Sequence, residues 1–419
     1  MINLTRLWTG QAQPADHLRY GEGRQAPKSS TGRRPIVVWN ITRTCNLRCM
    51  HCYADSDRKA YSGELTLPEC KAVIDDLAGF GIPGLLLSGG EPMVHPHFWD
   101  IAEYARSKGL RLTLSTNGTL IDEAKAARLK ELEFAYIGIS LDGIGMVHDI
   151  FRRTQGAFDK AVAAFRNLKK VDQKTGLRFT LTKHNAAHLE PVLDLIEKEE
   201  IQRVCFYHLV PSGRGGELQW LEPQECRDAL DKLLARIEQW AAKGITREVL
   251  TVTQPADGIY LMLRQEREAP ERAVETNRLL SWNGGANAGP GTGIGNIDSQ
   301  GNVHADQFSQ SWALGNVRQR PFSEIWQDTS GNERLSLLRG QGGAITGRCS
   351  KCRFLDRCGG GFRQRAATIT GDPCGSDPTC PLTDEEIFAP TTKATSSHDC
   401  SRPKSCSDSE LDRCAACQV

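Results

Sequence analysis

The stretch Cys45-Asn46-Leu47-Arg48-Cys49-Met50-His51-Cys52 decides the fold, and it follows an apolar run over residues 35–41. A cubane [4Fe–4S] cluster has one iron at each of its metal corners and usually takes a thiolate on each. A loop that supplies three thiolates therefore leaves one iron open to a ligand that is not protein. Zinc is the alternative, with His51 as a fourth ligand, although zinc sites usually show other spacings. The spacing predicts a cluster with an open coordination position.

This cysteine spacing, together with the aromatic Tyr53 that follows it, resembles the signature of the radical SAM superfamily. The resemblance implies that S-adenosylmethionine (SAM) chelates the open iron through its amino and carboxylate groups. An electron from the cluster then breaks the sulfonium C–S bond and releases a 5′-deoxyadenosyl radical. Cys45, Cys49 and Cys52 are thus expected to be both the metal ligands and the catalytic residues.

The bulk composition favours a cytoplasmic protein without nucleic-acid or membrane partners. Basic and acidic residues nearly cancel, at 52 and 51 in 419 residues, so no overall field attracts a polyanion or a membrane surface. The amino terminus lacks the apolar core of a secretory signal. The 15 cysteines are too many for packing alone, and a reducing compartment favours metal or cluster ligation over disulfides. Cys70, Cys205 and Cys226 lie singly in apolar patterns and are expected to fill the core.

Apolar strands alternate with amphipathic helices from residue 35 onward, which predicts parallel βα units covered on both faces. The expected strands lie at 35–41, 84–88, 111–115, 136–140, 178–182 and 204–208. The expected helices begin at Thr66 and then span 97–108, 122–132, 157–171, 188–200 and 222–243. Six units are fewer than the eight of a closed TIM barrel. We therefore expect an α/β fold with an open, partial (β/α)6 TIM-like barrel, which the superfamily resemblance also implies.

The composition changes along the chain and predicts four regions. Residues 1–34 are polar and rich in Gly, Pro and Arg, which indicates a flexible N-terminal arm. The barrel is expected over 35–245, and a small second domain, dense in Cys, Gly and Pro, over 250–390. Residues 391–419 form a polar tail with four further cysteines.

The ends of the predicted strands carry the candidate SAM pocket, since chemistry in parallel barrels gathers where strands end. Glycines there allow close backbone approach, and a glutamate can accept from an ammonium group. By resemblance these residues contact the methionine, ribose and adenine of SAM, and Arg152 pairs with the methionine carboxylate. The expected cofactor-binding residues are His51, Gly89, Gly90, Glu91, Ser115, Asn117, Ser140, Asp142 and Arg152.

A second cysteine group, over residues 349–380, resembles the SPASM or twitch region that holds auxiliary [4Fe–4S] clusters. Complete versions hold two clusters, but residues 291–306 contain no cysteine here, and Asp306 stands where a thiolate is expected. We therefore expect one auxiliary cluster. Its expected ligands are Cys349, Cys352, Cys358 and Cys380, with Cys374 as the alternative fourth ligand. Zinc on the same sulfurs is the other alternative, and the tail cysteines Cys400, Cys406, Cys414 and Cys417 stay unassigned.

The segments 206–215 and 361–365, with Trp39-Asn40 and Arg152, resemble the radical SAM enzymes of modified-haem biosynthesis. The haem d1 group is the nearest, and the decarboxylating haem synthases of the alternative haem pathway come second. The resemblance implies radical attack on propionates of a sirohaem-derived tetrapyrrole, didecarboxysirohaem, with a small electron donor such as flavodoxin or ferredoxin. Basic and aromatic side chains near the last strands are expected to meet this substrate. They are His184, Tyr207, His208 and Arg214.

Two other classes of protein stay open. A peptide or protein maturase shares the cysteine loop and the C-terminal pattern. The 44 residues before Cys45 are too few for the recognition domain that many maturases carry, and the expected loss of one auxiliary cluster also counts against this class. The second class is not enzymatic: an iron–sulfur carrier or a zinc-stabilised interaction module.

Overall fold

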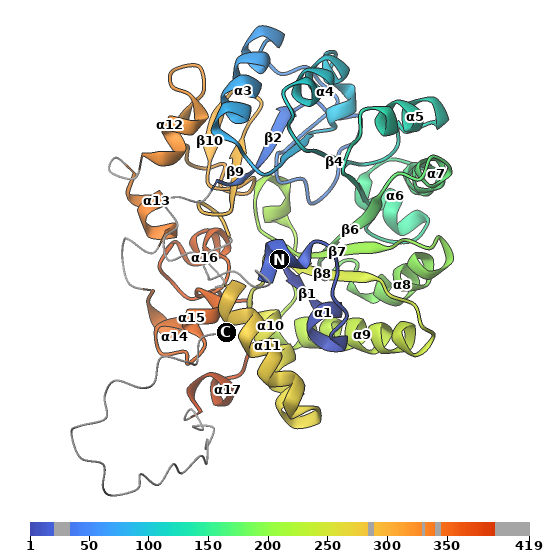
Figure 1. Ribbon diagram of the computed structural model, residues 1–419. Helices are drawn as coiled ribbons and strands as arrows, with labels where there is room; N and C mark the ends of the chain where they lie inside the picture. The colour runs from blue at the N-terminus through green and yellow to red at the C-terminus, as the bar shows by residue number, and fades with distance from the viewer. Residues whose placement is uncertain (21–33, 284–288, 329–331, 340–344, 390–419) are drawn as a thin grey trace, which may run out of the picture. The chain divides into compact units, whose positions relative to one another are not determined.

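The barrel wall is a run of parallel strands in chain order (Figure 1). This computed structural model describes residues 1–20, 34–283, 289–328, 332–339 and 345–389. The strands are β2 (Ile36–Thr42), β3 (Leu85–Gly89), β4 (Leu112–Thr116), β5 (Tyr136–Ser140), β6 (Thr175–Leu181), β7 (Arg203–His208) and β8 (Glu248–Val252). The six predicted strands are confirmed, and β8 extends the wall by one that the sequence pattern did not reveal.

The helices that cover the outer face of this wall are also confirmed within a residue or two. They are α3 (Leu67–Phe80), α4 (Phe98–Ser107), α5 (Glu123–Glu131), α7 (Ala157–Lys170), α8 (Leu189–Lys198) and α9 (Pro223–Ala242). The first of them shows the local cause: Thr66 and Glu69 form a capping box, and Gly81 ends the helix in a left-handed conformation. A short helix, α6 (Met146–Arg152), was not predicted. The result is the expected α/β open barrel.

The expectation of a flexible arm is wrong for residues 1–20. β1 (Ile2–Asn3) pairs antiparallel with β8, and α1 (Leu4–Thr9) and α2 (Asp16–Tyr20) follow it. Leu4 and Leu7 are fully buried, and the Thr5 hydroxyl donates to the carbonyl of Arg247 at 2.7 Å. Burial of these leucines, which the polar average of the segment hides, holds the segment in place. Residues 21–33 of the expected arm lie outside the described residues.

The region after β8 continues the barrel sheet, because β9 (Ile294–Ile297) pairs in parallel with β2. β10 (Asn302–His304) and β11 (Gly315–Asn316) extend it as antiparallel strands. The helices of this region are α10 (Ala256–Glu268), α11 (Pro270–Asn283), α12 (Phe322–Gln327), α13 (Glu333–Leu338), α14 (Gly347–Ser350), α15 (Leu355–Cys358), α16 (Arg363–Thr370) and α17 (Asp384–Phe388). Residues 1–388 pack as one compact unit, so the boundary expected near residue 245 is not a break in packing.

The core lies on both faces of the sheet, with Trp39, Phe179 and Phe206 among its largest buried side chains. The buried positions of Cys70, Cys205 and Cys226 agree with their expected core role. In the part of the chain that the structure describes, no helix has the length and apolarity to cross a membrane. The predicted tail over 391–419, with its four cysteines, lies outside the described residues.

Candidate active site

The three-cysteine loop folds its sulfurs together after β2. Cys45 and Cys49 are buried, and Cys52 packs against them. Each sulfur also meets an N–H group: the backbone N–H of Leu47 donates to Cys45 Sγ at 3.3 Å, and that of Ser56 donates to Cys52 Sγ at 3.3 Å. Burial raises the pKa of the Cys45 thiol. Since an unbound thiolate is disfavoured there, these sulfurs suit a cationic partner such as iron.

The two glycines after β3 bring that strand end against the cysteine loop. A Cβ on Gly90 would lie 2.2 Å from the carbonyl oxygen of Thr44, and one on Gly89 would lie 2.3 Å from that of Thr42. Both contacts are well inside van der Waals distance. The glycines therefore allow the close approach of two protein segments, and this packing role accounts for them without a ligand.

Glu91 is fully buried beside this turn and already has partners. Its carboxylate accepts from the backbone N–H of Asn117 and the hydroxyl of Thr116, each at 2.8 Å. Burial raises its pKa to about 7, although these hydrogen bonds act in the opposite direction. The Asn117 amide donates to the side chain of Asn46 at 2.8 Å. Glu91 thus joins the ends of β3 and β4, and Asn117 joins the end of β4 to the cysteine loop.

Asp142 and Arg152 form a buried ion pair behind the cysteine loop. Arg152 Nη1 also lies 3.4 Å from Cys49 Sγ. Burial alone would raise the pKa of Asp142, but the Arg152 guanidinium outweighs burial and lowers it. His51 stacks on Phe151 with ring centroids 4.7 Å apart, and burial lowers its pKa to about 4, so this imidazole is neutral at physiological pH.

A cavity of about 700 Å³ opens at the carboxyl ends of the strands. Its lining includes six of the predicted site residues, namely His51, Ser115, Ser140, Arg152, Tyr207 and His208. Gly89, Gly90, Glu91, Asn117 and Asp142 are absent from that lining within the described residues. The predicted set therefore divides into residues that line the cavity and residues that support its wall.

Sequence comparison identifies the family. The profile of the Radical SAM superfamily matches residues 39–196. A protein of Methanosarcina barkeri (strain Fusaro / DSM 804) named Fe-coproporphyrin III synthase is 45% identical over 397 residues, which cover 92% of this chain and 99% of that protein. The chain belongs to the radical SAM superfamily.

Further radical SAM relatives cover most of the chain. The Pre-heme d1 synthase of Dinoroseobacter shibae (strain DSM 16493 / NCIMB 14021 / DFL 12) is 39% identical over 85% of this chain and 89% of that protein. An AdoMet-dependent heme synthase of Methanosarcina barkeri (strain Fusaro / DSM 804) is 31% identical over 82% of this chain and 95% of that protein.

Solved structures share the fold. The structure described as native anSMEcpe with bound AdoMet and Cp18Cys peptide has a TM-score of 0.64, with 20% identity over 84% of this chain and 95% of that one. Streptococcus suis SuiB bound to S-adenosylmethionine has a TM-score of 0.65, with 15% identity over 84% of this chain and 78% of that one. The radical SAM partial barrel with a C-terminal cysteine-rich region is therefore confirmed.

Membership implies a [4Fe–4S] cluster on the three-cysteine loop and the use of SAM. When bound, these two groups supply the adenosyl radical. The protein's own contribution is visible in the contacts above: N–H groups surround the sulfurs, and the cavity at the strand ends lies beside them. A neutral His51 fixed by stacking can present an aromatic face to a ligand in that cavity.

The predicted substrate residues of this radical SAM enzyme take different places. Tyr207 and His208 line the cavity, but His208 Nε2 is already 2.9 Å from Asp257 Oδ2. His184 stacks on Phe151 at 5.8 Å between centroids. The role expected for Arg214 is wrong: its guanidinium donates to the carbonyls of Cys49 and Ser56 at 3.0 and 2.7 Å, and to the Asp55 carboxylate at 2.7 Å. Arg214 therefore fastens the cysteine loop and has few donors left for a substrate.

The second cysteine group surrounds a cavity of its own. Cys349, Cys352, Cys358 and Cys380 all line it, whereas Cys374 is absent from the lining residues that the structure describes. The backbone N–H of Phe354 donates to Cys352 Sγ at 3.4 Å. Across the described ranges, no group of three or more His, Cys, Asp or Glu side chains is placed to hold a metal ion. The fit of both cysteine groups to clusters therefore depends on these cavities and sulfur contacts.

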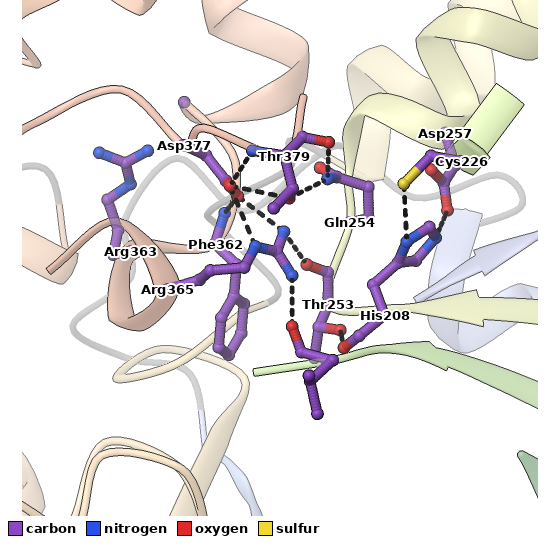
Figure 2. Close-up of polar contacts among 12 residues, drawn as sticks. His208, Cys226, Thr253, Gln254, Asp257, Phe362, Arg363, Arg365, Asp377 and Thr379 are labelled. Atoms are coloured by element: carbon purple, nitrogen blue, oxygen red, sulfur yellow. Dashed lines mark hydrogen bonds and ion pairs between the residues drawn. The ribbon is translucent and has the colours of Figure 1, made fainter. Parts of the chain in front are cut away.

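The residues that join this cysteine-rich region to the barrel were not predicted (Figure 2). Arg365 is fully buried and forms a two-bond ion pair with Asp377, at 3.0 Å from Nε and 2.7 Å from Nη2. Arg365 Nη2 also donates to the carbonyl of Thr253, just after β8, at 2.9 Å. Gln254 donates to the hydroxyl of Thr379 at 3.0 Å. The run of arginines in 361–365 was the available sequence signal, but it did not reveal which arginine is paired.

Proposed function

We propose that this radical SAM enzyme removes side chains from an iron tetrapyrrole of the sirohaem-derived type and forms Fe-coproporphyrin III. The observation that carries the proposal is the 45% identity to a Fe-coproporphyrin III synthase over nearly the full length of both chains. Identity to the Pre-heme d1 synthase is lower, at 39%. The alternative haem pathway, which the sequence pattern placed second, is therefore favoured over haem d1 synthesis.

The product's name fixes the chemistry to test. A coproporphyrin carries only propionate and methyl side chains at its rim, whereas didecarboxysirohaem also carries acetate side chains on its reduced rings. Conversion must therefore remove the acetates and keep the propionates. The haem d1 branch changes propionates instead. The second candidate function, pre-haem d1 synthesis, thus differs in which side chain is lost.

The proposed assignments follow the geometry. Cys45, Cys49 and Cys52 hold the cluster that SAM completes, with His51, Ser115, Ser140 and Arg152 around SAM. The remaining residues of the predicted SAM set support the wall of that cavity. Cys349, Cys352, Cys358 and Cys380 hold one auxiliary [4Fe–4S] cluster. A flavodoxin or ferredoxin supplies electrons. These assignments are supported by the lining of the two cavities.

The deciding experiment is anaerobic turnover of the reconstituted enzyme with SAM, dithionite and didecarboxysirohaem. The mass of the product should correspond to loss of the acetate side chains, with formation of 5′-deoxyadenosine, and Cys45→Ala should abolish both. A product that has lost propionates instead would favour the haem d1 branch. An unchanged tetrapyrrole would exclude both branches and leave a maturase, and absence of 5′-deoxyadenosine would leave a carrier.

Iron and sulfide counts test the cluster assignments separately. Two cubanes give ~8 irons per chain. Cys45→Ala and Cys349→Ala should each lose about half of the iron, and each should retain the absorbance of the other cluster. If Cys349→Ala retains the full iron content, the auxiliary assignment fails.

A further inference from the structure

A second large cavity lies beside the active site. It has a volume of about 1250 Å³, which is enough for a large cofactor-sized ligand. Its lining is mainly apolar and includes Pro290, Ile294, Phe308, Leu337, Leu338 and Phe362. Gln307 and Phe308 line both this cavity and the active-site cavity. A ligand that fills it therefore lies next to the place where the radical forms.

Arg363 lines this cavity with an unused pair of donors. The residue is only 8% exposed, and its Nη1 donates to the carbonyl of Gly375 at 2.6 Å. Among the described residues, Nε and Nη2 are buried without a hydrogen-bond partner. These two N–H groups form one edge of the guanidinium, and this edge matches the two oxygens of a carboxylate. Leaving both unpaired in a buried place is unfavourable unless a ligand binds there.

Arg365, two residues further along α16, shows the same edge in use. Its Nε and Nη2 both bind the Asp377 carboxylate. Residues two apart on a helix point in nearly opposite directions, and Figure 2 shows Arg363 directed away from the Arg365–Asp377 pair. The protein thus supplies an internal carboxylate to one arginine and leaves the other facing the cavity.

A second unpartnered polar group lines the same cavity. Asp306 is 2% exposed. Its Oδ1 accepts from the N–H of Phe308 and from the N–H and hydroxyl of Ser309, at 2.8 to 2.9 Å. Its Oδ2 has no partner in the described part of the chain. A cavity with an open cationic edge and an open anionic oxygen suits a ligand that carries carboxylates at its rim and a metal cation at its centre.

We propose that this cavity holds the substrate tetrapyrrole and that the Nε–Nη2 edge of Arg363 binds one of its side-chain carboxylates. The apolar lining receives the flat ring, and the shared wall at Phe308 places the ring beside the SAM cavity. This inference rests on the proposed function for the class of substrate. It assigns the site and the specificity-determining residue, which the proposed function leaves open.

Equilibrium binding tests the inference without turnover. The anaerobically reconstituted holoenzyme is titrated with didecarboxysirohaem and, separately, with an iron porphyrin that carries alkyl side chains only, and the Soret absorbance is followed. Arg363→Gln should weaken binding of didecarboxysirohaem by about tenfold or more, the range for hydrogen bonds to a charged group. It should leave binding of the alkyl porphyrin unchanged. Arg363→Lys should fall between, because it keeps the charge and loses the two-donor edge.

Arg320→Gln is the matched control, since Arg320 forms a half-exposed ion pair with Asp328 at 2.9 Å away from the cavity. It should bind both porphyrins as the wild type does. Iron content and substrate-free formation of 5′-deoxyadenosine confirm that each variant is folded and loaded. Equal affinity of Arg363→Gln and wild type for didecarboxysirohaem overturns the inference, and so does an equal loss for both porphyrins.

The two proposals fail in different ways. If the wild type binds neither porphyrin, both are overturned. Binding that depends on Arg363, without turnover of didecarboxysirohaem, supports the cavity assignment and overturns the proposed function. Turnover with binding that is independent of Arg363 does the reverse.

Discussion

Removing the Asp377 carboxylate should destabilise the junction between the barrel and the cysteine-rich region. Arg365 is fully buried, so in Asp377→Ala its charge has no counter-ion and little access to water. Breaking one partner of a buried ion pair costs about 3–5 kcal/mol. The N–H groups of Phe362 and Thr379, which donate to Asp377 at 2.9 and 3.1 Å, lose their acceptor as well. We expect the free energy of unfolding to fall by about 3–5 kcal/mol, a large share of the total stability of a typical domain.

The measurement is the guanidinium unfolding midpoint of the anaerobic protein, converted with a common slope for all variants. Arg365→Met combined with Asp377→Leu removes both charges and should recover a substantial part of the loss, because no unpaired charge remains. Glu275→Gln is the control. Glu275 makes the same two-bond contact with Arg278, at 2.7 and 2.8 Å, but that pair is exposed. Its loss should be within about 1 kcal/mol.

The auxiliary iron gives a second readout, since Asp377 accepts from the N–H of Cys380 at 3.3 Å through its carbonyl. Asp377→Ala should therefore lose auxiliary iron before it loses the iron of the three-cysteine loop. Two results would refute the reasoning. One is an Asp377→Ala variant as stable as the control, and the other is a double variant less stable than Asp377→Ala, since the unpaired charge would then not be the cause.

Three further predictions concern the barrel. Gly90→Ala should abolish 5′-deoxyadenosine formation, because its Cβ would lie 2.2 Å from a backbone oxygen; Gly79→Ala, where nothing lies within 4 Å, should retain it, and equal activity would contradict the packing argument. Leu7→Ala should lower the free energy of unfolding by about 2–5 kcal/mol in denaturant titration, whereas a loose arm would give no change. Burial alone would lower the pKa of His208, but Asp257 outweighs it and raises the pKa to about 10. Its stabilising contribution should thus be complete below about pH 6.5 and be lost as the pH rises through about 10; unfolding midpoints across this range should show that slope, and Asp257→Asn should flatten it.

The barrel could be predicted because its signals are local. Each parallel strand is buried on both faces and appears as a short apolar run, and each helix carries its own start or stop signal, as the Thr66 capping box does. The cysteine loop is equally local, since one turn of chain supplies its three sulfurs. What failed was local in composition but not in contact. Residues 1–20 look polar on average, yet Leu4 and Leu7 are buried against elements more than two hundred residues away, such as Arg247 and β8.

The roles of the charged residues could not be predicted for a related reason. Arg214 was expected to meet a substrate carboxylate, but its partners are backbone carbonyls of the cysteine loop, about 160 residues earlier in the chain. Asp142 and Arg152, expected to contact different parts of SAM, form a pair with each other. A charged side chain at a strand end marks the right place in the barrel. Whether it faces the ligand or another residue depends on partners that only the fold brings near.

Arg363 and Arg365 show this limit most clearly, because the sequence offers the same residue twice within one short run. Helical geometry places them on opposite sides of α16, but nothing local says which side is protein and which is cavity. Asp377 decides the matter for Arg365, and it reaches that position only because a glycine at 361 allows close approach: a Cβ there would lie 2.5 Å from Cβ of Asp377. Once this internal carboxylate is assigned, the corresponding edge of Arg363 needs another carboxylate. The substrate that the relatives' names suggest is one that carries them.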